Sequence, residues 1–273
     1  MKGGKRFPTA AAAGSAIIML FVLLGIFAPL IAPYGESEFI GEAWEPISSQ
    51  FWLGTDNLGR DMLSRLLYGA RITIFIALAA TMLSFFIGAT GGLLAASQRG
   101  IVDSILSRTV DLLLAFPPLI FALVILSVLP SSTPILILVM AFLDFTRVFR
   151  VSYSSALSVI TADFYEAAKL RREKTGYLLW REILPNVLPP LLAEFGLRFS
   201  FMILFLSSLS FLGLGVQPPS ADWGSIVKEN KDGIAFGILA PLIPAIAIAT
   251  LAVSVNVVVD WVLNRVISGD KHG

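Results

Sequence analysis

Five long runs without a charged residue limit how this chain can fold. They cover residues 10–33, 72–97, 112–143, 199–221 and 233–259, and each exceeds the roughly 20 apolar residues that cross about 30 Å of hydrocarbon as a helix. Of the 273 residues, 14% are charged and 56% are hydrophobic, whereas soluble domains carry about 25% charged residues. The sequence therefore predicts an all-helical protein that crosses a membrane several times.

The run at 112–143 is too long for one ordinary span. Its centre, "VLPSSTP" at 128–134, contains two prolines and three hydroxyl residues, a composition that breaks a helix and favours a turn. Division at this turn predicts six spans, of which the fourth is the least apolar because Asp144, Arg147 and Arg150 fall inside it. The predicted spans together make up residues 10–263 and lie at 10–33, 72–97, 105–129, 135–156, 187–216 and 234–263.

Lysine and arginine counts predict the orientation of these spans, because cytoplasmic loops of membrane proteins are enriched in both residues. One side receives 14 of the 20 basic residues and the other receives 5, with Arg198 inside a span. Both termini, residues 1–9 and 264–273, and the loop at 157–186 are therefore predicted to be cytoplasmic, whereas residues 34–71 lie outside. The first run has 24 uncharged residues, more than the roughly 7–15 of a cleavable signal peptide, and is predicted to be retained.

The segment "FWLGTDNLGRDMLSRLLYGARITIF", residues 51–75, places five charges directly before the second run. From Gly59 onward, apolar residues recur at helical spacing while polar residues occupy the opposite face, the pattern of an amphipathic helix in the membrane interface. We therefore predict an interfacial helix on the outer side that leads into the second span. Its apolar face would contain Met62, Leu63, Leu66 and Leu67, and its polar face Arg60, Asp61, Ser64 and Arg65.

Several chemistries are excluded by residues that the sequence lacks. There is no cysteine, and the one histidine, His272, is next to the C-terminus, so neither a Cys/His dyad nor a multi-histidine zinc centre can form. No G-x-x-x-x-G-K-[ST] loop occurs, which excludes ATP hydrolysis by this chain. We expect a protein that is not an enzyme and binds no metal or cofactor of its own. Uphill transport would then take its energy from another polypeptide or from an ion gradient.

The longest cytoplasmic loop contains "DFYEAAKLRREKTGYLLWREILPNVLPPLL", residues 163–192. Asp163 and Glu166 have the spacing of a capping box, which predicts a first short helix. Gly176 then allows a bend, and a second short helix, "YLLWREIL", ends at Pro185. Two amphipathic helices that project from the membrane predict a docking element, the alternative being a solvated basic loop. The apolar face of the first helix would contain Phe164, Ala167, Ala168 and Leu170.

This loop resembles the EAA motif of ABC importer permeases, in which E-A-A is followed by a glycine and later by I-L-P. "EAA" at 166–168 and "ILP" at 183–185 have the separation found in that family. The segments "WLGTDNLGRDMLSRLLYGAR", "LLLAFPPLIFAL" and "LSFLGLGVQPPSADWGSIV" extend the resemblance over residues 15–265 and are similar to the dipeptide, oligopeptide and nickel type of permease. One residue departs from the pattern. The family's glycine, six residues after the motif glutamate, is Arg172 here, and the nearest glycine is Gly176.

The resemblance implies an all-α polytopic membrane protein with the type I importer permease fold, whose cytoplasmic helix pair at 163–185 docks into a separate ATPase. It implies three kinds of protein partner: a second related permease, two ATP-binding subunits that hold ATP and Mg²⁺, and an extracytoplasmic substrate-binding protein. The complex is expected in the lipid of a bacterial inner membrane, and no nucleic acid is expected as a partner. The expected cargo is short peptides, with nickel complexes and other small solutes as alternatives. The implied ATPase-coupling residues are Glu166, Ala167, Ala168, Leu170, Arg171, Arg172, Gly176 and Pro185.

Two other classes of function stay open at this point. A secondary transporter driven by an ion gradient is the main alternative, and an intramembrane enzyme is the third possibility. A neighbouring gene for a Walker-type ATPase would favour the importer. Transport that collapses with the ion gradient and ignores ATP would favour the secondary transporter.

Glu194 and Arg198 are the charges in the fifth span and are expected to form an ion pair. They are four residues apart with the acid first, the favourable order on a helix, and an arginine near mid-membrane costs at least roughly 2.5–3.5 kcal/mol without a partner or water. They are candidates for lining the translocation pathway, the alternative being a structural pair at a partner permease.

Two further patterns are predicted to be structural: Gly88 and Gly92 allow close helix packing, and Trp223 suits an interfacial anchor.

Overall fold

The computed structural model describes residues 9–269, and within this range the regular structure is helical apart from one isolated β-bridge between Thr55 and Asp61. The all-α prediction is confirmed. The predictions made for residues 1–8 and 270–273, which include His272, lie outside the described residues. The elements are α1 (Thr9–Ile31), α2 (Met62–Gln98), α3 (Ile101–Leu114), α4 (Pro118–Val128), α5 (Thr133–Val159), α6 (Asp163–Leu170), α7 (Thr175–Tyr177), the π-helix η1 (Leu178–Ile183), α8 (Leu184–Phe211), α9 (Trp223–Asn230), the 3₁₀ helix η2 (Lys231–Phe236) and α10 (Leu242–Gly269).

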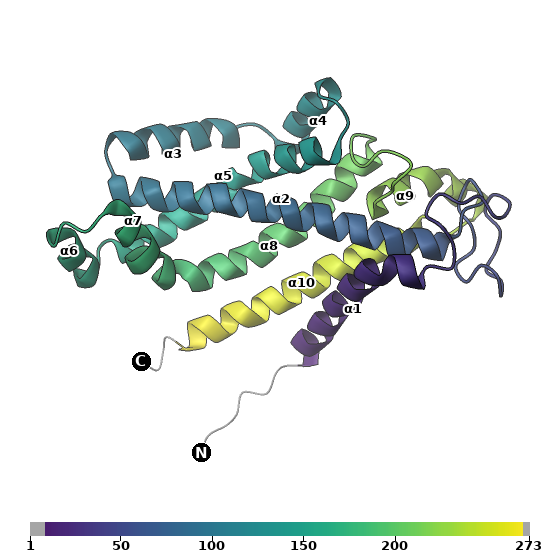
Figure 1. The fold of residues 1–273 in the computed structure, drawn as a ribbon, viewed down its shortest axis with the longest axis horizontal. Coiled ribbons are helices and arrows are strands. Elements are labelled where there is room, and N and C mark those ends of the chain that lie inside the picture. The colour runs from purple at the N-terminus through teal and green to yellow at the C-terminus, as the bar shows by residue number, and fades with distance from the viewer. Residues whose placement is uncertain (1–8, 270–273) are drawn as a thin grey trace, which may run out of the picture.

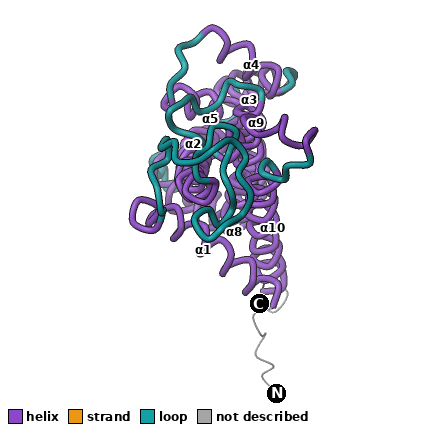
Figure 2. The backbone as a smooth tube through the Cα atoms, turned by 90° about the vertical axis from the view of Figure 1, so that its right-hand side faces the viewer, coloured by secondary structure: helices purple, strands orange, loops and turns teal. Residues whose placement is uncertain are grey.

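The long helices α1, α2, α5, α8 and α10 form one elongated bundle (Figure 1). At one end of it lie α6, α7 and the C-terminal end of α10. At the opposite end lie α9 and the loop of residues 32–61. Viewed from that second end, the loop passes across the ends of the helices and covers part of the bundle (Figure 2). We call these the coupling end and the loop end.

The number of helices that qualify as spans is lower than the six predicted. Among residues 9–269, four helical stretches are long and apolar enough to cross a membrane, and a fifth is added if α3 and α4 together make one span. These two helices meet at a bend of 87° instead of forming the single helix predicted at 105–129. The break occurs at Pro117 and Pro118, because proline lacks the backbone N–H and disfavours helix in the residue before it. A count of six stays a prediction, with α5 as the added span.

The predicted interfacial helix before the second span is wrong. The helix begins at Met62, where the Asp61 carboxylate accepts a hydrogen bond from the Ser64 N–H at 2.7 Å, and it continues without a break to Gln98. Both faces of its first turns are buried, including Met62 on the predicted apolar face and Arg65 on the predicted polar face. The polar face is not solvated because α9 and the loop before α2 supply ion-pair partners for it.

Two acids and two arginines at this end form a largely buried set that we call the loop-end cluster, namely Asp56, Arg60, Arg65 and Glu229. The Asp56 carboxylate contacts Arg60 Nε and Arg65 Nη1, each at 2.6 Å, and Glu229 of α9 contacts Arg60 Nη2 and, at 2.7 Å, Arg65 Nη1. The cluster therefore connects the loop, the first turn of α2 and α9. Its charges serve to close the loop end of the bundle.

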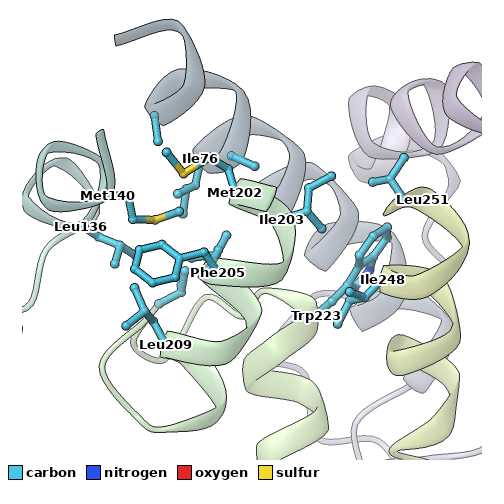
Figure 3. Close-up of a cluster of buried hydrophobic side chains, with 14 of the residues drawn as sticks. Ile76, Leu136, Met140, Met202, Ile203, Phe205, Leu209, Trp223, Ile248 and Leu251 are labelled. Carbon is cyan, nitrogen blue, oxygen red and sulfur yellow. The ribbon is translucent and has the colours of Figure 1, made fainter. Parts of the chain in front are cut away.

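Trp223 lies in the bundle core and is not the interfacial anchor that the sequence predicted. Its side chain is fully buried beside Ile248 and near Ile203 and Leu251 (Figure 3). The indole Nε1–H donates to the Leu66 carbonyl at 2.9 Å, so its polar group is satisfied inside the protein. The indole therefore joins α9 to α2.

Gly88 and Gly92 pack α2 against α5, as their spacing predicted. A Cβ atom at Gly88 would lie 2.5 Å from the Phe145 carbonyl oxygen, and one at Gly92 would lie 2.5 Å from that of Phe149. Both distances are shorter than a side chain can tolerate next to backbone. The two glycines therefore fix the approach of α2 and α5.

Candidate functional site

The predicted coupling segment, residues 163–185, lies at the coupling end of the bundle (Figure 1). In α6 the side chains of Tyr165 and Ala168 are buried and pack with Leu178 and Ile183 of the following turns. Burial raises the pKa of the Tyr165 hydroxyl, and its hydrogen bond with the Ser97 side chain opposes part of this shift. These contacts hold α6 against the bundle.

The opposite face of α6 has no covering element among the described residues. Glu166 and Ala167 are exposed, and Leu170 is 84% exposed. Of the predicted apolar face, only Ala168 points inward, because α6 touches the bundle along one narrow stripe. The predicted capping box is also wrong, since the N-cap is Ala162 and no side chain caps the helix there.

The segment turns at Arg172, not at Gly176 as predicted. Arg172 has a φ of 60°, in the left-handed region. Its N–H bonds to the Lys169 carbonyl at 2.9 Å, and the Glu173 N–H bonds to the Ala168 carbonyl at 3.4 Å. This is the hydrogen-bond pattern of a Schellman motif, whose left-handed residue is usually glycine. Arg172 therefore adopts a backbone conformation that glycine usually takes, and its neighbour Arg171 lies on the exposed side, 3.6 Å from Glu173.

Gly176 and Pro185 both lie inside helical structure. Gly176 is in α7, and the helix continues through η1 into α8, so that residues 175–211 form one helical stretch. The predicted second helix therefore does not end at Pro185. Pro185 has no N–H and its ring clashes with the carbonyl four residues before it, which accounts for the wider π-helical turn at 178–183 just ahead of it. The second half of the coupling segment, residues 175–185, is therefore continuous with the span after it, whereas α6 is separated from it by the turn at residues 171–174.

Further along α8, Glu194 and Arg198 form the predicted ion pair. Arg198 Nε lies 2.7 Å from Glu194 Oε1, and both side chains are largely shielded. The same guanidinium contacts a third charged residue, because Arg198 Nη1 lies 3.5 Å from Asp144 Oδ1 of α5. The pair is thus part of a larger group that bridges α5 and α8.

We name this group the mid-bundle cluster and define it as Asp144, Arg147, Glu194 and Arg198. Asp144 Oδ1 also lies 3.9 Å from Arg147 Nη1, while its Oδ2 accepts a hydrogen bond from the Ser84 hydroxyl of α2 at 3.1 Å. Asp144 and Arg147 were not among the predicted site residues. The sequence could have identified them as candidates, because two charges three residues apart in an apolar span indicate a helix face that does not contact lipid.

No arrangement suited to a metal ion occurs in the described part of the chain, where no three His, Cys, Asp or Glu residues come together. The two charged clusters instead pair acids with arginines. Such pairs can bind charged groups of a ligand or hold helices together, and neither provides a nucleophile with an adjacent base.

Comparison with known proteins identifies the family. The profile of the binding-protein-dependent transport system inner membrane component matches residues 88–268. The di/tripeptide transport system permease protein DppC of Pseudomonas aeruginosa is 32% identical over 90% of this chain and 84% of its own length. The dipeptide permease protein DppC of Alkalihalophilus pseudofirmus is 32% identical (90% and 82%), and the oligopeptide permease protein OppC of Bacillus subtilis is 33% identical (90% and 81%). The chain belongs to the family of binding-protein-dependent transport system inner membrane components.

Proposed function

We propose that this chain is the permease subunit of an ATP-driven importer of di- and oligopeptides, and that residues 163–185 couple it to a separate ATPase. The observation that carries the proposal is the exposed face of α6, whose buried side packs on η1, the start of the continuous helix that leads into α8. A force on α6 would therefore reach α8 through these packing contacts. The peptide permeases similar to this chain over 90% of its length support peptides as the cargo.

The coupling residues divide by the side they face. Glu166, Ala167 and Leu170 form the surface that would enter the groove of an ATPase, and Arg171 lies at its edge. Ala168 holds α6 to the bundle from behind. Arg172 makes the turn, while Gly176 and Pro185 shape the connection to α8, so these three act on the position of the surface.

The remaining parts of the importer follow from the same proposal. A second related permease would complete the pathway, two ATP-binding subunits would hold ATP and Mg²⁺, and an extracytoplasmic binding protein would deliver the peptide at the loop end. The coupling end would then face the cytoplasm of a bacterial inner membrane, with both termini on that side. The mid-bundle cluster would lie along the pathway between the two ends.

The test is the substitution Ala167→Arg in the assembled importer. Ala167 is exposed, so the larger side chain leaves the fold of this chain intact but cannot enter a packed groove. We expect normal membrane insertion, loss of the ATPase subunits on purification and loss of ATP-dependent peptide uptake. The matched control is Ile101→Arg, because Ile101 is also exposed at the coupling end but outside the segment; it should retain both properties.

Normal uptake by Ala167→Arg at normal abundance would contradict the coupling role. The secondary-transporter alternative is tested on the wild-type importer in proteoliposomes. Uptake that requires ATP and persists when the ion gradient is collapsed supports the importer, and the opposite result supports a gradient-driven transporter.

A further inference from the structure

Arg147 has the least satisfied guanidinium of the mid-bundle cluster. Among residues 9–269 its one ion-pair contact is Asp144 at 3.9 Å, the longest in the cluster, and its side chain is 33% exposed. Its guanidinium otherwise lies over the Phe201 ring, 4.7 Å from the centroid. A guanidinium carries five N–H donors. Most of the donors of Arg147 are therefore directed away from this chain's own acids.

The position of Arg147 along α5 indicates what its unpaired N–H donors face. It lies 14 residues into a helix of 27, which places it about 21 Å along an element of about 40 Å at 1.5 Å per residue. α5 is the added sixth span that we predicted and is not one of the helices that qualify as spans by length and apolar character. With α5 in the membrane, Arg147 lies near its middle, where an arginine is expensive in lipid and faces a water-filled pathway or another subunit instead.

The surroundings of Arg147 are fixed in place before any ligand arrives. Asp144 is buried and is itself held by Ser84 of α2. Arg198 is held by Glu194 and by Asp144, and its guanidinium lies 5.7 Å from the Phe201 centroid, so that two arginines flank one aromatic ring. The result is a pair of positive groups that share one acid, Asp144, while Glu194 pairs with Arg198 alone.

We propose that Arg147, supported by Arg198 and Phe201, binds the carboxylate of the peptide in transit. The inference rests on the proposed function, which supplies a peptide as cargo. Arginine presents parallel N–H groups that match a carboxylate bidentately, and Arg147 is the member of the cluster with donors free for it. Asp144 and Glu194 keep the site neutral when it is empty, so the carboxylate is held without being trapped by excess positive charge.

The experiment uses the absence of cysteine from this chain. The complete importer with Arg147→Cys is reconstituted in proteoliposomes and then treated with aminoethyl methanethiosulfonate, which restores a positive charge, or sulfonatoethyl methanethiosulfonate, which adds a negative one. Peptide uptake, co-purification of the partner permease and labelling by mass spectrometry are measured. The wild-type importer receives both reagents to account for cysteines elsewhere in the complex. The matched control is Arg150→Cys, one turn along α5, where the arginine pairs with Asp111.

We expect the Arg147→Cys importer to assemble and to take up peptide at least about tenfold more slowly, the loss of one charge-assisted contact. The positive adduct should recover much of the rate and the negative adduct none of it, while Arg150→Cys stays within about twofold of wild type. Wild-type uptake by unmodified Arg147→Cys, equal uptake with the two adducts, or failure of the cysteine to label from water would overturn the proposal.

Loss of the partner permease from purified Arg147→Cys would also overturn it, because the open donors would then belong to a subunit contact. If the wild-type importer itself takes up no peptide with ATP, the proposed function fails and this site fails with it. That result is distinct from a loss of uptake confined to Arg147→Cys.

Discussion

The two charged clusters contain the same residue types, namely one aspartate, one glutamate and two arginines. They differ in how completely the rest of the protein encloses them. In the loop-end cluster the contacts of Asp56 are 2.6 Å and its side chain is 0% exposed. In the mid-bundle cluster the contacts of Asp144 are 3.5 and 3.9 Å, and one arginine is a third exposed. Residue composition alone therefore does not distinguish a cluster that stabilises the fold from one in which an arginine has N–H donors without a partner in the described chain.

The reason lies in what covers each cluster. The loop of residues 32–61 and α9 cover the loop-end cluster, whereas Arg147 on α5 is covered only in part, by Phe201 of α8, and its side chain stays 33% exposed. Enclosure has a cost at the loop end, where Arg65 makes both of its ion pairs through Nη1 and its Nε and Nη2 are buried without a hydrogen-bond partner among the described residues. Buried donors left in this state destabilise the fold, so the locked cluster depends strongly on Asp56.

The largest effect is expected for Asp56→Asn. The substitution keeps the size of the side chain but leaves Arg60 and Arg65 with only Glu229, and removal of one partner from a buried ion pair costs about 3–5 kcal/mol. We expect a large fall in abundance and in the thermal unfolding midpoint of the detergent-solubilised protein. Glu38→Gln, at an exposed carboxylate of the same loop, is the control and should behave as wild type. Equal midpoints for the two variants would show that the loop-end cluster does not lock the fold.

An intermediate effect is expected for Asp144→Asn. Its contacts with arginine are longer and the amide can still bond to Ser84, so the loss of stability should be about 1–3 kcal/mol, less than for Asp56→Asn. Uptake per assembled importer should also fall, because Arg147 and Arg198 lose their shared acid. The same unfolding assay, together with uptake normalised to assembled complex, measures both. A larger loss of stability than that of Asp56→Asn would reverse the comparison between the clusters.

The smallest effect is expected for Glu229→Gln. Glu229 contacts the same two arginines as Asp56, but its side chain is 23% exposed, so that water screens the pair. Both arginines keep Asp56, and the expected loss is at most about 1 kcal/mol. Unfolding midpoints of Glu229→Gln and Asp56→Asn, measured side by side, test whether burial sets the contribution of an acid within one cluster. A loss as large as that of Asp56→Asn would show that it does not.

Much of the architecture was readable from local sequence. Hydrophobic runs predicted helices that overlap α1, α2, α5, α8 and α10, because a chain in lipid must satisfy its backbone groups inside each segment. The glycine spacing at 88 and 92 predicted close packing, and the spacing of Glu194 and Arg198 predicted their ion pair, since both patterns depend on neighbours along one helix. The motifs of the family also predicted the family to which the chain belongs.

The errors concern features that depend on distant residues. The segment before α2 has an amphipathic pattern, but its polar face is buried because Glu229, more than 160 residues away, meets Arg60 and Arg65. Trp223 has the sequence context of an interfacial anchor and instead fills the core between α9 and α2. Periodicity reports that a face is polar or apolar, and it cannot report what will cover that face.

The turn of the coupling segment shows the same division on a smaller scale. The sequence alone determined that a short helix carrying Glu166 and Ala167 follows α5 and precedes the next span, because composition and motif are local. Only the tertiary structure decided that the turn is made at Arg172, that Ala168 faces inward, and that the helix runs on through Pro185. Those outcomes are fixed by packing of α6 and η1 against α2 and α5, a contact between segments that no single stretch of sequence contains.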